Sequence, residues 1–239
     1  MWDNPRLLNA TASLLSGLAV ALLFVAAAQL LIRSPLLELR EVTVLGAPTH
    51  TDREQIRRAT QQVVSGANFL AVDLDALRGA LERLPWVRRV ELRRIWPDRL
   101  EVTLEEHVAF ARWGDAGLVN THGELFAAQS DESLPVFAGP PGAEAQVLRR
   151  YRRFAELLVP LADAPQRVTL TSRYAWQLRL ASGLHIELGR DYTAEPAERR
   201  LARFVASYPQ TLARMQRRHE YVDLRYANGF ALRVPELDG

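Results

Sequence analysis

The pattern of apolar and polar positions first sets apart residues 10–32. No charged residue lies between Arg6 and Arg33, and from residue 14 onward the run is apolar apart from one serine, one glycine and one glutamine. A helix rises 1.5 Å per residue, so about 20 such residues cross a hydrocarbon core about 30 Å thick. A helix also pairs its own backbone groups, which lipid cannot do. The pattern therefore predicts one membrane-spanning helix over residues 10–32, behind a head formed by residues 1–9.

A secretory signal peptide is the alternative interpretation of this stretch. Arg6 would be its basic region, residues 14–25 its apolar region and residues 26–28 its cleavage site. The apolar run resumes at residues 30–32, however, which makes it longer than such a region usually is. The charges at the two ends nearly balance, so they decide little about orientation. The short head and long tail favour an anchor whose tail is translocated.

Shorter periodic elements follow, and they predict a first domain over residues 36–106. A strand over residues 41–45 precedes a helix that we expect to begin at a capping box, Thr51 to Glu54. Asp73 caps a second helix that ends before Pro85. Two strands, 87–95 and 99–106, form a hairpin. The order predicts an α+β unit with both helices on one face of a three-stranded sheet.

A second domain, predicted over residues 107–235, is a mixed antiparallel β domain with flanking helices, followed by a tail of residues 236–239. Its expected strands are residues 108–113, 118–120, 125–126, 168–171, 176–180 and 184–188. Helices are expected over residues 149–161 and 195–215, with Pro209 kinking the second. An Asn-Gly pair joins the last two strands, 221–226 and 230–234, which predicts a hairpin.

Composition excludes several classes of function. The 30 basic residues are all arginine, and 28 acidic residues nearly balance them along the chain. A nucleic-acid binder usually gathers its basic residues into a patch, so we expect no nucleic-acid partner. The absence of cysteine excludes disulfides, thiol catalysis and cysteine-bound zinc.

Catalytic and metal-binding patterns are also missing. The five histidines are scattered singly, without the spacing of a metal site. No phosphate-binding loop or nucleophile motif occurs, and the adjacent carboxylates fall on segments expected to face water. We therefore expect no enzyme, no catalytic residue, no metal, no cofactor and no small-molecule substrate.

The first hairpin carries aromatic and basic residues that need an interpretation. Trp86 and Trp96 are expected to pack at its edges rather than to stack on a ligand. Four arginines lie on its first strand and form either a solvated face or a docking surface: Arg88, Arg89, Arg93 and Arg94.

These residues carry a resemblance to a known family. The segment LPWVRRVELRRIWPDRLEVTLEEHVAFARW, directly after a single span and a β-α-α pattern, resembles the POTRA domain of the bacterial FtsQ/DivIB cell-division family. The resemblance continues through Trp176-Gln177-Leu178, Tyr208-Pro209 and the run YVDLRY at residues 221–226. It thus covers almost the whole chain.

The resemblance implies a function and a site. It implies a bitopic inner-membrane scaffold of the divisome, single-pass and type II, with its bulk in the periplasm and enrichment at the septum. Its expected partners are the small single-span proteins FtsB and FtsL. The family's binding residues correspond here to Arg173, Tyr226, Asn228, Gly229 and Phe230.

Two positions depart from the family pattern, and two other functions remain open. Ser207 and Val234 stand where the family has a larger apolar residue and an aromatic residue. One alternative is a POTRA-type chaperone for outer-membrane proteins, and the other is a membrane-tethered enzyme of unrecognised type.

Overall fold

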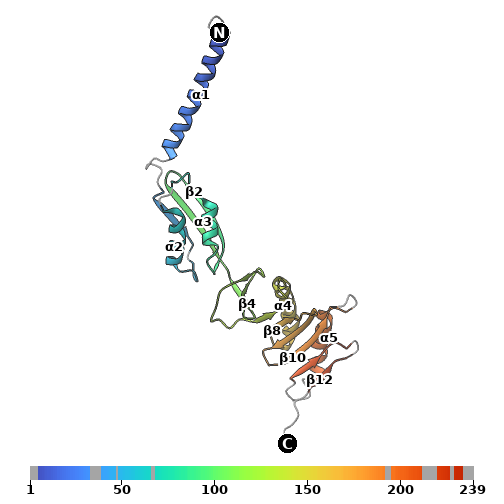
Figure 1. The fold of residues 1–239 in the computed structure, drawn as a ribbon. Helices are drawn as coiled ribbons and strands as arrows, with labels where there is room; N and C mark the ends of the chain where they lie inside the picture. Colours follow the sequence, from blue (N-terminus) through green and yellow to red (C-terminus); the bar gives the residue numbers. More distant parts are fainter. Residues whose placement is uncertain are drawn as a thin grey trace. The chain divides into compact units, whose positions relative to one another are not determined.

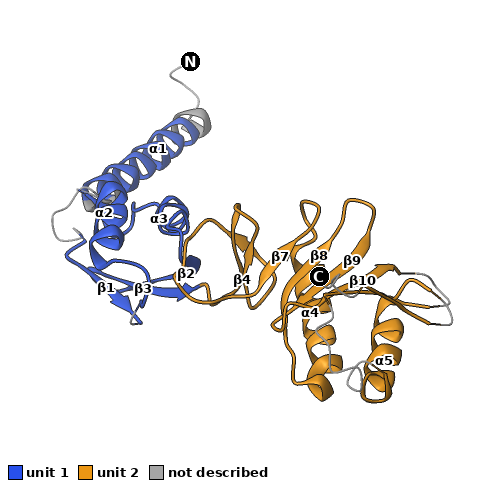
Figure 2. Ribbon diagram, turned by 90° about the horizontal axis from the view of Figure 1, so that it is seen from below, with its two compact units in different colours: residues 1–106 blue, residues 107–239 orange. Residues whose placement is uncertain are grey.

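The computed structural model describes residues 5–32, 39–46, 48–65, 68–191, 195–211, 220–226 and 229–233. The chain divides into two compact units, unit 1 from Met1 to Glu106 and unit 2 from His107 to Gly239 (Figure 2).

The predicted long apolar helix is confirmed as α1, Pro5–Ile32 (Figure 1). It begins at Pro5, five residues earlier than expected, and proline is well tolerated in a first helical turn. Within it, Asn9–Ala27 is long and apolar enough to cross a membrane, with a mean hydropathy of 2.1 and none of the segment buried inside the protein. Side chains such as Leu23 and Phe24 are 69% and 74% exposed. Exposed apolar surface of this length suits a lipid environment.

The part of unit 1 that follows α1 folds as predicted, with two helices and three strands. In chain order these are β1 Glu41–Leu45, α2 Arg53–Val64, α3 Leu74–Leu81, β2 Val87–Ile95 and β3 Arg99–Glu106. The sheet has the order β1-β3-β2, with β1 parallel and β2 antiparallel to β3. Alternation along β3 buries Leu100 and Val102 against Leu77 and Leu81 of α3. The three-stranded sheet therefore has two edges, β1 and β2.

The capping box predicted at Thr51 is wrong. Asp52 caps α2, because its side chain accepts a hydrogen bond from the Glu54 amide at 3.1 Å. Asp73 caps α3 as expected, and its Oδ1 accepts from the amides of Asp75 and Ala76. The Thr51 hydroxyl instead donates to Glu106 at 2.5 Å.

The Glu106 carboxylate holds the loop between β1 and α2. It accepts hydrogen bonds from the backbone amides of Thr49, His50 and Thr51 at 2.8, 3.2 and 2.7 Å. Burial raises the pKa of Glu106, but the Thr51 hydroxyl and the three amides outweigh it, so the pKa lies below its usual value. His50 also stacks on Trp86, with ring centroids 3.9 Å apart. The last residue of β3 thus fixes the entry to α2.

Trp96 does not pack as predicted, and the arginines of β2 divide into two groups. Trp96 is 78% exposed at the tip of the β2–β3 hairpin, whereas Trp86 is half-buried. Arg89 and Arg93 are exposed. Arg88 pairs with Glu105 at 2.7 Å, and Arg94 donates to the backbone carbonyls of Phe69 and Val72. Two of the four arginines therefore have structural partners.

Unit 2 is built on a nine-stranded sheet with the order β12-β11-β10-β9-β8-β7-β4-β5-β6. The strands are β4 Ala109–Trp113, β5 Gly117–Asn120, β6 Leu125–Phe126, β7 Val136–Ala138, β8 Pro165–Leu170, β9 Ala175–Leu180, β10 His185–Arg190, β11 Tyr221–Asp223 and β12 Ala231–Arg233. Three neighbouring pairs are parallel, β4 with β7, β7 with β8, and β10 with β11. The sheet is therefore mixed, as expected.

Two helices cover one face of this sheet, α4 Glu144–Leu158 and α5 Ala197–Ser207 (Figure 2). Phe154 and Phe204 from the helices and Trp176 from β9 are almost fully buried in the shared core. A short 3-10 helix, Val159–Leu161, follows α4, and another, Tyr208–Gln210, follows α5. Pro209 thus marks the end of α5 rather than a kink, and part of the predicted continuation to residue 215 lies outside the described residues.

The start predicted for α4 is wrong by five residues, because the helix begins at Glu144 rather than at residue 149. Glu144 occupies the first turn, so the following arginines lie in the helix interior. Arg150 pairs with Asp191 at 2.6 Å and with Glu198, and it lies over the Trp176 ring. Asp191 also accepts from the Ala197 amide at 2.8 Å. This cluster joins α4, the end of β10 and the start of α5.

The tether at Glu106 generates a stability prediction. We expect Glu106→Gln to lower the free energy of unfolding of unit 1 by about 2 kcal/mol, because charged hydrogen bonds contribute roughly 1.5–3 kcal/mol. Amide hydrogen exchange at Thr49, His50 and Thr51 should become faster. Glu105→Gln is the matched control, because Glu105 is half-exposed in a surface ion pair and should cost less than about 1 kcal/mol.

The same carboxylate predicts a pH dependence. Its folded pKa is lowered, so its stabilisation is fully present above the unfolded pKa, about 4.3, and is lost as the pH falls through the folded pKa. Urea unfolding of the wild-type protein between pH 6 and acidic pH should therefore show a steeper loss of stability than unfolding of Glu106→Gln. Parallel curves for the two proteins would contradict this role.

Candidate partner-binding site

The strand β12 forms one end of the unit 2 sheet. It pairs antiparallel with β11 through Tyr221 opposite Arg233, Val222 opposite Leu232, and Asp223 opposite Ala231. Within the described residues no strand pairs with its other side. An edge of this kind offers unpaired amide and carbonyl groups to another chain.

The hydrogen bonds of β11 identify which backbone groups of β12 face outward. The His185 amide donates to the Glu220 carbonyl, and the Leu224 amide donates to the Glu187 carbonyl. Because backbone groups alternate in direction along a strand, those of Tyr221 and Asp223 face β12. Their partners Arg233 and Ala231 are used by this pairing. The amide and carbonyl of Leu232 therefore point away from the sheet.

Side chains on either side of the edge attach β12 to the core. Leu232 and Phe230 are half-buried and pack against the core of unit 2. The Phe230 ring meets Phe204 of α5 edge-on, with centroids 5.5 Å apart. Phe230 therefore holds β12 on the core. The sequence analysis gave it only a partner-binding role.

The other residues predicted on this hairpin have different environments. Tyr226 is 57% exposed, and its carbonyl accepts a hydrogen bond from Arg203 at 3.1 Å. Gly229 is exposed, and no atom lies near the position that a Cβ would occupy. Asn228 lies outside the described residues, as does Val234. Ser207 donates to the Phe204 carbonyl at the end of α5.

Arg173 lies at some distance along the chain, on the turn between β8 and β9. It is exposed and, among the described residues, forms no ion pair. It lines an open depression of about 520 Å³ at the ends of β9, β10 and β11, together with Gln177, Glu187, Arg190 and Arg225. The fold thus places Arg173 beside the segment that leads from β11 to Tyr226.

Hydrogen bonds to two carboxylates fix the positions of side chains in and next to this depression. Arg225 binds Asp223 through two guanidinium nitrogens, with the shorter contact at 2.6 Å. This hydrogen bond lowers the pKa of Asp223 against the opposing effect of its burial, and Asp223 raises the pKa of Arg225. Glu187 is buried and accepts from Gln177 at 2.8 Å. The hydrogen bond from the neutral Gln177 leaves the charge of Glu187 in place, but the three arginines that line the depression, Arg173, Arg190 and Arg225, outnumber Glu187 and Asp223.

A row of basic and aromatic side chains crosses five neighbouring strands on the same sheet. Register places these residues opposite one another in the order Arg167, Arg179, His185, Tyr221 and Arg233. His185 stacks on Tyr221 with centroids 5.4 Å apart, and Arg233 lies over the Tyr221 ring. The three arginines are exposed and, in the described part of the chain, form no ion pairs. The row ends at the free strand and favours an acidic neighbour.

Sequence reasoning missed Arg225, Glu187 and Arg190. Their signal was weak, because each is a single charged residue in or next to a strand and the depression forms only when β10 lies beside β11. Gly189 was a clearer signal of a close approach between strands, because its φ is 73° and a Cβ there would come within 2.8 Å of Arg225. A glycine is required where another side chain approaches the backbone this closely.

The arrangement is suited to binding a protein segment. Among the described residues no group of three histidine, cysteine, aspartate or glutamate side chains is placed to hold a metal ion. The strand edge offers backbone hydrogen bonds, and the adjacent depression offers guanidinium groups for a carboxylate.

Comparisons with known proteins place the whole chain in one family. A model described as POTRA domain, FtsQ-type, matches residues 37–107, and a model described as cell division protein FtsQ/DivIB, C-terminal, matches residues 111–225. The chain is 42% identical to the cell division protein FtsQ of Burkholderia pseudomallei over 98% of this chain and 94% of that protein. It is likewise 42% identical to FtsQ of Nitrosospira multiformis over 98% and 99% of the two chains.

Similarity extends to more distant relatives. The cell division protein FtsQ of Escherichia coli is 33% identical over 82% of this chain and 72% of its own length. Both family models and the near-complete coverage agree with the resemblance carried by the POTRA segment. The chain belongs to the FtsQ/DivIB family of bacterial cell-division proteins.

Proposed function

We propose that this chain is a non-catalytic, bitopic scaffold of the division machinery in the inner membrane. α1 anchors it, and the part of unit 1 that follows α1 lies in the periplasm together with unit 2, where both gather at the division septum. Its partners are small single-span proteins of the FtsB and FtsL type. Family membership and the apolar helix support this assignment.

The free edge of β12 is the observation that carries the proposal. A partner segment adds beside β12 as a further strand and pairs with the outward amide and carbonyl of Leu232. Phe230 and Leu232 hold β12 against the core, so the edge is already ordered before the partner arrives. Preordering lowers the entropic cost of binding.

The depression supplies the electrostatic part of the contact. Arg173 lies on its rim without an ion-pair partner among the described residues, and Arg225 is held in place by Asp223. A guanidinium group binds a carboxylate through two parallel hydrogen bonds. We infer that the partner places an acidic side chain here while its adjacent segment pairs with β12. Tyr226 and Gly229 then form the near side of the contact, and Asn228, which lies outside the described residues, is proposed as a partner-binding residue from the family resemblance alone.

The topology can be tested directly, because the chain has no cysteine of its own. A single cysteine at the exposed Gln129 of unit 2 should react in intact spheroplasts with a maleimide that cannot cross the membrane. A cysteine at Asp3 should react only after the membrane is opened. The reverse pattern would place the folded units in the cytoplasm.

The strand pairing can be tested by changing one backbone atom. Ligation at Ala227, followed by conversion of the ligation cysteine to alanine, gives full-length protein with an ester in place of the Leu232 amide. The ester removes the outward donor and keeps the side chain. We expect binding of a purified FtsB-type partner, measured by calorimetry in nanodiscs, to weaken roughly two- to tenfold, the equivalent of one hydrogen bond.

An ester at Arg233 is the matched control, because that amide faces β11. It should loosen β12, seen as faster hydrogen exchange of Ala231, whereas the Leu232 ester should leave this exchange unchanged. Unchanged partner affinity in the Leu232 ester would rule out the free edge as the binding strand.

The role of the depression predicts a charge effect. Arg173→Glu should weaken partner binding roughly tenfold at low salt, and the difference should shrink as salt screens the contact. Arg149→Glu makes the same change of charge at an exposed position of α4 and should alter the affinity less than about twofold. Equal losses in the two variants would indicate only a general effect of net charge.

A further inference from the structure

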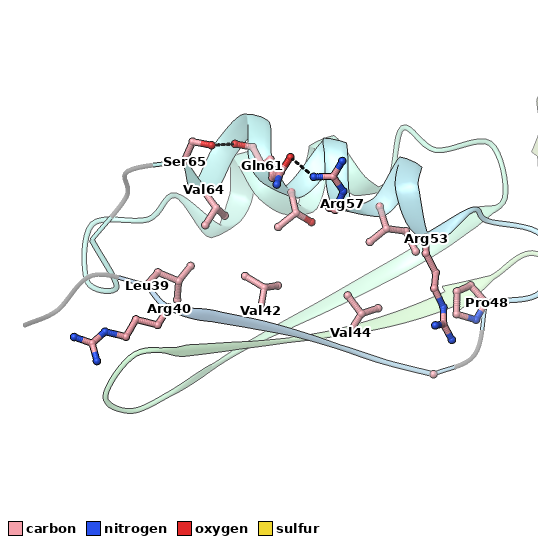
Figure 3. A pocket seen from close by; sticks show the side chains of 13 residues that line it. Leu39, Arg40, Val42, Val44, Pro48, Arg53, Arg57, Gln61, Val64 and Ser65 are labelled. Carbon is pink, nitrogen blue, oxygen red and sulfur yellow. Dashed lines mark hydrogen bonds between the residues drawn. The ribbon is translucent and has the colours of Figure 1, made fainter. Parts of the chain in front are cut away.

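A second free edge lies in unit 1, beside a groove. The groove has a volume of about 720 Å³ and runs between β1 and α2 (Figure 3). Val42 and Val44 of β1 lie across it from Val64 of α2, and Leu39 lies at one end. Ile56 of α2 also lines the groove. Val44 is 36% exposed and is the most accessible of these apolar side chains.

The backbone of β1 beside this groove has no neighbour on its outer side. β1 is the end strand in the order β1-β3-β2 and, among the described residues, pairs only with β3. The Arg40 and Glu41 amides both donate to the Asp98 carbonyl of the β2–β3 turn, at 3.0 and 3.4 Å, so this contact alone does not orient the strand. The Val90 amide of β2 instead donates to the Glu82 side chain, so the alternate residues of β2 pair with Thr103 and Glu101. Leu100 and Val102 of β3 therefore turn their backbone groups to β1. Val42 and Val44, which lie opposite Leu100 and Val102 in parallel register, therefore direct their amide and carbonyl groups away from β3. The outward backbone groups and the apolar side chains of the groove therefore belong to the same two residues.

A polar side chain in the groove also lacks a partner. Thr60 of α2 lines the groove and is only 7% exposed, and its Oγ1 has no hydrogen-bond partner among the described residues. Threonine in a helix commonly donates to the carbonyl one turn earlier, but this one does not. A buried hydroxyl left unpaired is costly. The Oγ1 atom is itself buried, so the Thr60 side chain has to turn about χ1 into the groove before its hydroxyl can donate to a backbone carbonyl of an occupant.

Cations stand at both ends of the groove. Figure 3 shows Arg40 beside Leu39 at one end and Arg53 beside Pro48 at the other. Neither forms an ion pair within the described part of the chain. Arg57 is different, because Glu54 and Gln61 already bind it. The ends of the groove thus favour negative charge.

We propose that the groove between β1 and α2 binds an extended segment of a partner protein. The segment has about five residues with alternating apolar side chains, and an acidic residue flanks it at each end. β1 spans about 16 Å, which sets this length. The segment adds to the free edge of β1, its apolar side chains cover Val42 and Val44, and the Thr60 hydroxyl donates to it. Arg40 and Arg53 bind the two carboxylates.

A partner fits better than a second copy of this chain. Pairing two β1 edges would bring the arginines that flank one groove towards those that flank the other, and like charges repel. This site lies in unit 1 and uses no residue of β12. It therefore goes beyond the proposed function and can fail or succeed independently of it.

The test uses the full chain in nanodiscs and a dye-labelled peptide, Asp-Val-Thr-Val-Thr-Val-Asp, with fluorescence anisotropy as the measurement. The same residues in the order Asp-Val-Val-Val-Thr-Thr-Asp form the control peptide. We expect the alternating peptide to bind more tightly and to protect the amides of Val42 and Val44 from hydrogen exchange. Equal binding of both peptides, or no protection of these amides, would overturn the proposal.

Charge exchange provides the specific variant. Arg53→Glu should weaken binding of the peptide with two acidic ends about fivefold to tenfold and favour the same peptide with lysine in place of one of its two aspartates, because Arg40 still binds the other. Arg89→Glu, at an exposed position on the opposite edge strand β2, is the matched control and should change neither preference. An unchanged preference in Arg53→Glu would overturn the assignment of the groove ends.

Thr60→Val separates binding from folding. A purely structural role predicts that removing an unpaired hydroxyl leaves the protein equally or more stable and binding unchanged. The proposal predicts equal or higher stability together with roughly threefold to tenfold weaker peptide binding. Self-association that Val44→Asp abolishes, in a protein that does not bind the peptide, would show that a second copy occupies the groove and would overturn the partner assignment.

Discussion

An open β-sheet must end in a strand whose outer backbone groups have no partner in the sheet. One edge of the unit 1 sheet is β1, and one edge of the unit 2 sheet is β12. In both strands the residues with outward backbone groups also pack their side chains towards a helix. Most proteins blunt such edges with charge, bulges or a covering element. Here both edges are short and are flanked by arginines, so each favours a partner that supplies backbone groups together with carboxylates.

The helices determine which face of the larger sheet remains available. α4 and α5 bury Trp176, Leu178 and Ile186 on one face, and alternation sends Arg179, His185 and Tyr221 to the other. The Arg150 cluster ties the two helices to the end of β10, which keeps this covered face in place. The charged row and the depression are therefore consequences of packing on the opposite side. The charged surface beside β12 is thus the uncovered face of the same sheet that forms the core of unit 2.

The local errors in the sequence predictions each have a physical cause, and for the capping box it is competition from a distant residue. Thr51 has the spacing of a helix cap, but the Glu106 carboxylate, more than fifty residues away, takes its hydroxyl and its amide. The helix predicted to begin at residue 149 begins at Glu144, so its arginines lie in the helix interior, where Arg150 pairs with Asp191 and Glu198. Trp96 was expected to pack because aromatic residues usually do, yet its side chain is 78% exposed among the described residues, at the tip of the hairpin.

The sequence by itself determined the features that depend on short-range periodicity. These are the apolar helix α1, the two helices of unit 1, the alternation of β3 and the last hairpin, because each follows from the spacing of apolar residues. Only the tertiary structure decided the pairing order of the strands. It thereby decided that β1 and β12 are edges, that Arg173 lies beside Arg225, and that Thr60 is buried without a partner. Such features depend on contacts between residues far apart in the chain, which no local pattern contains.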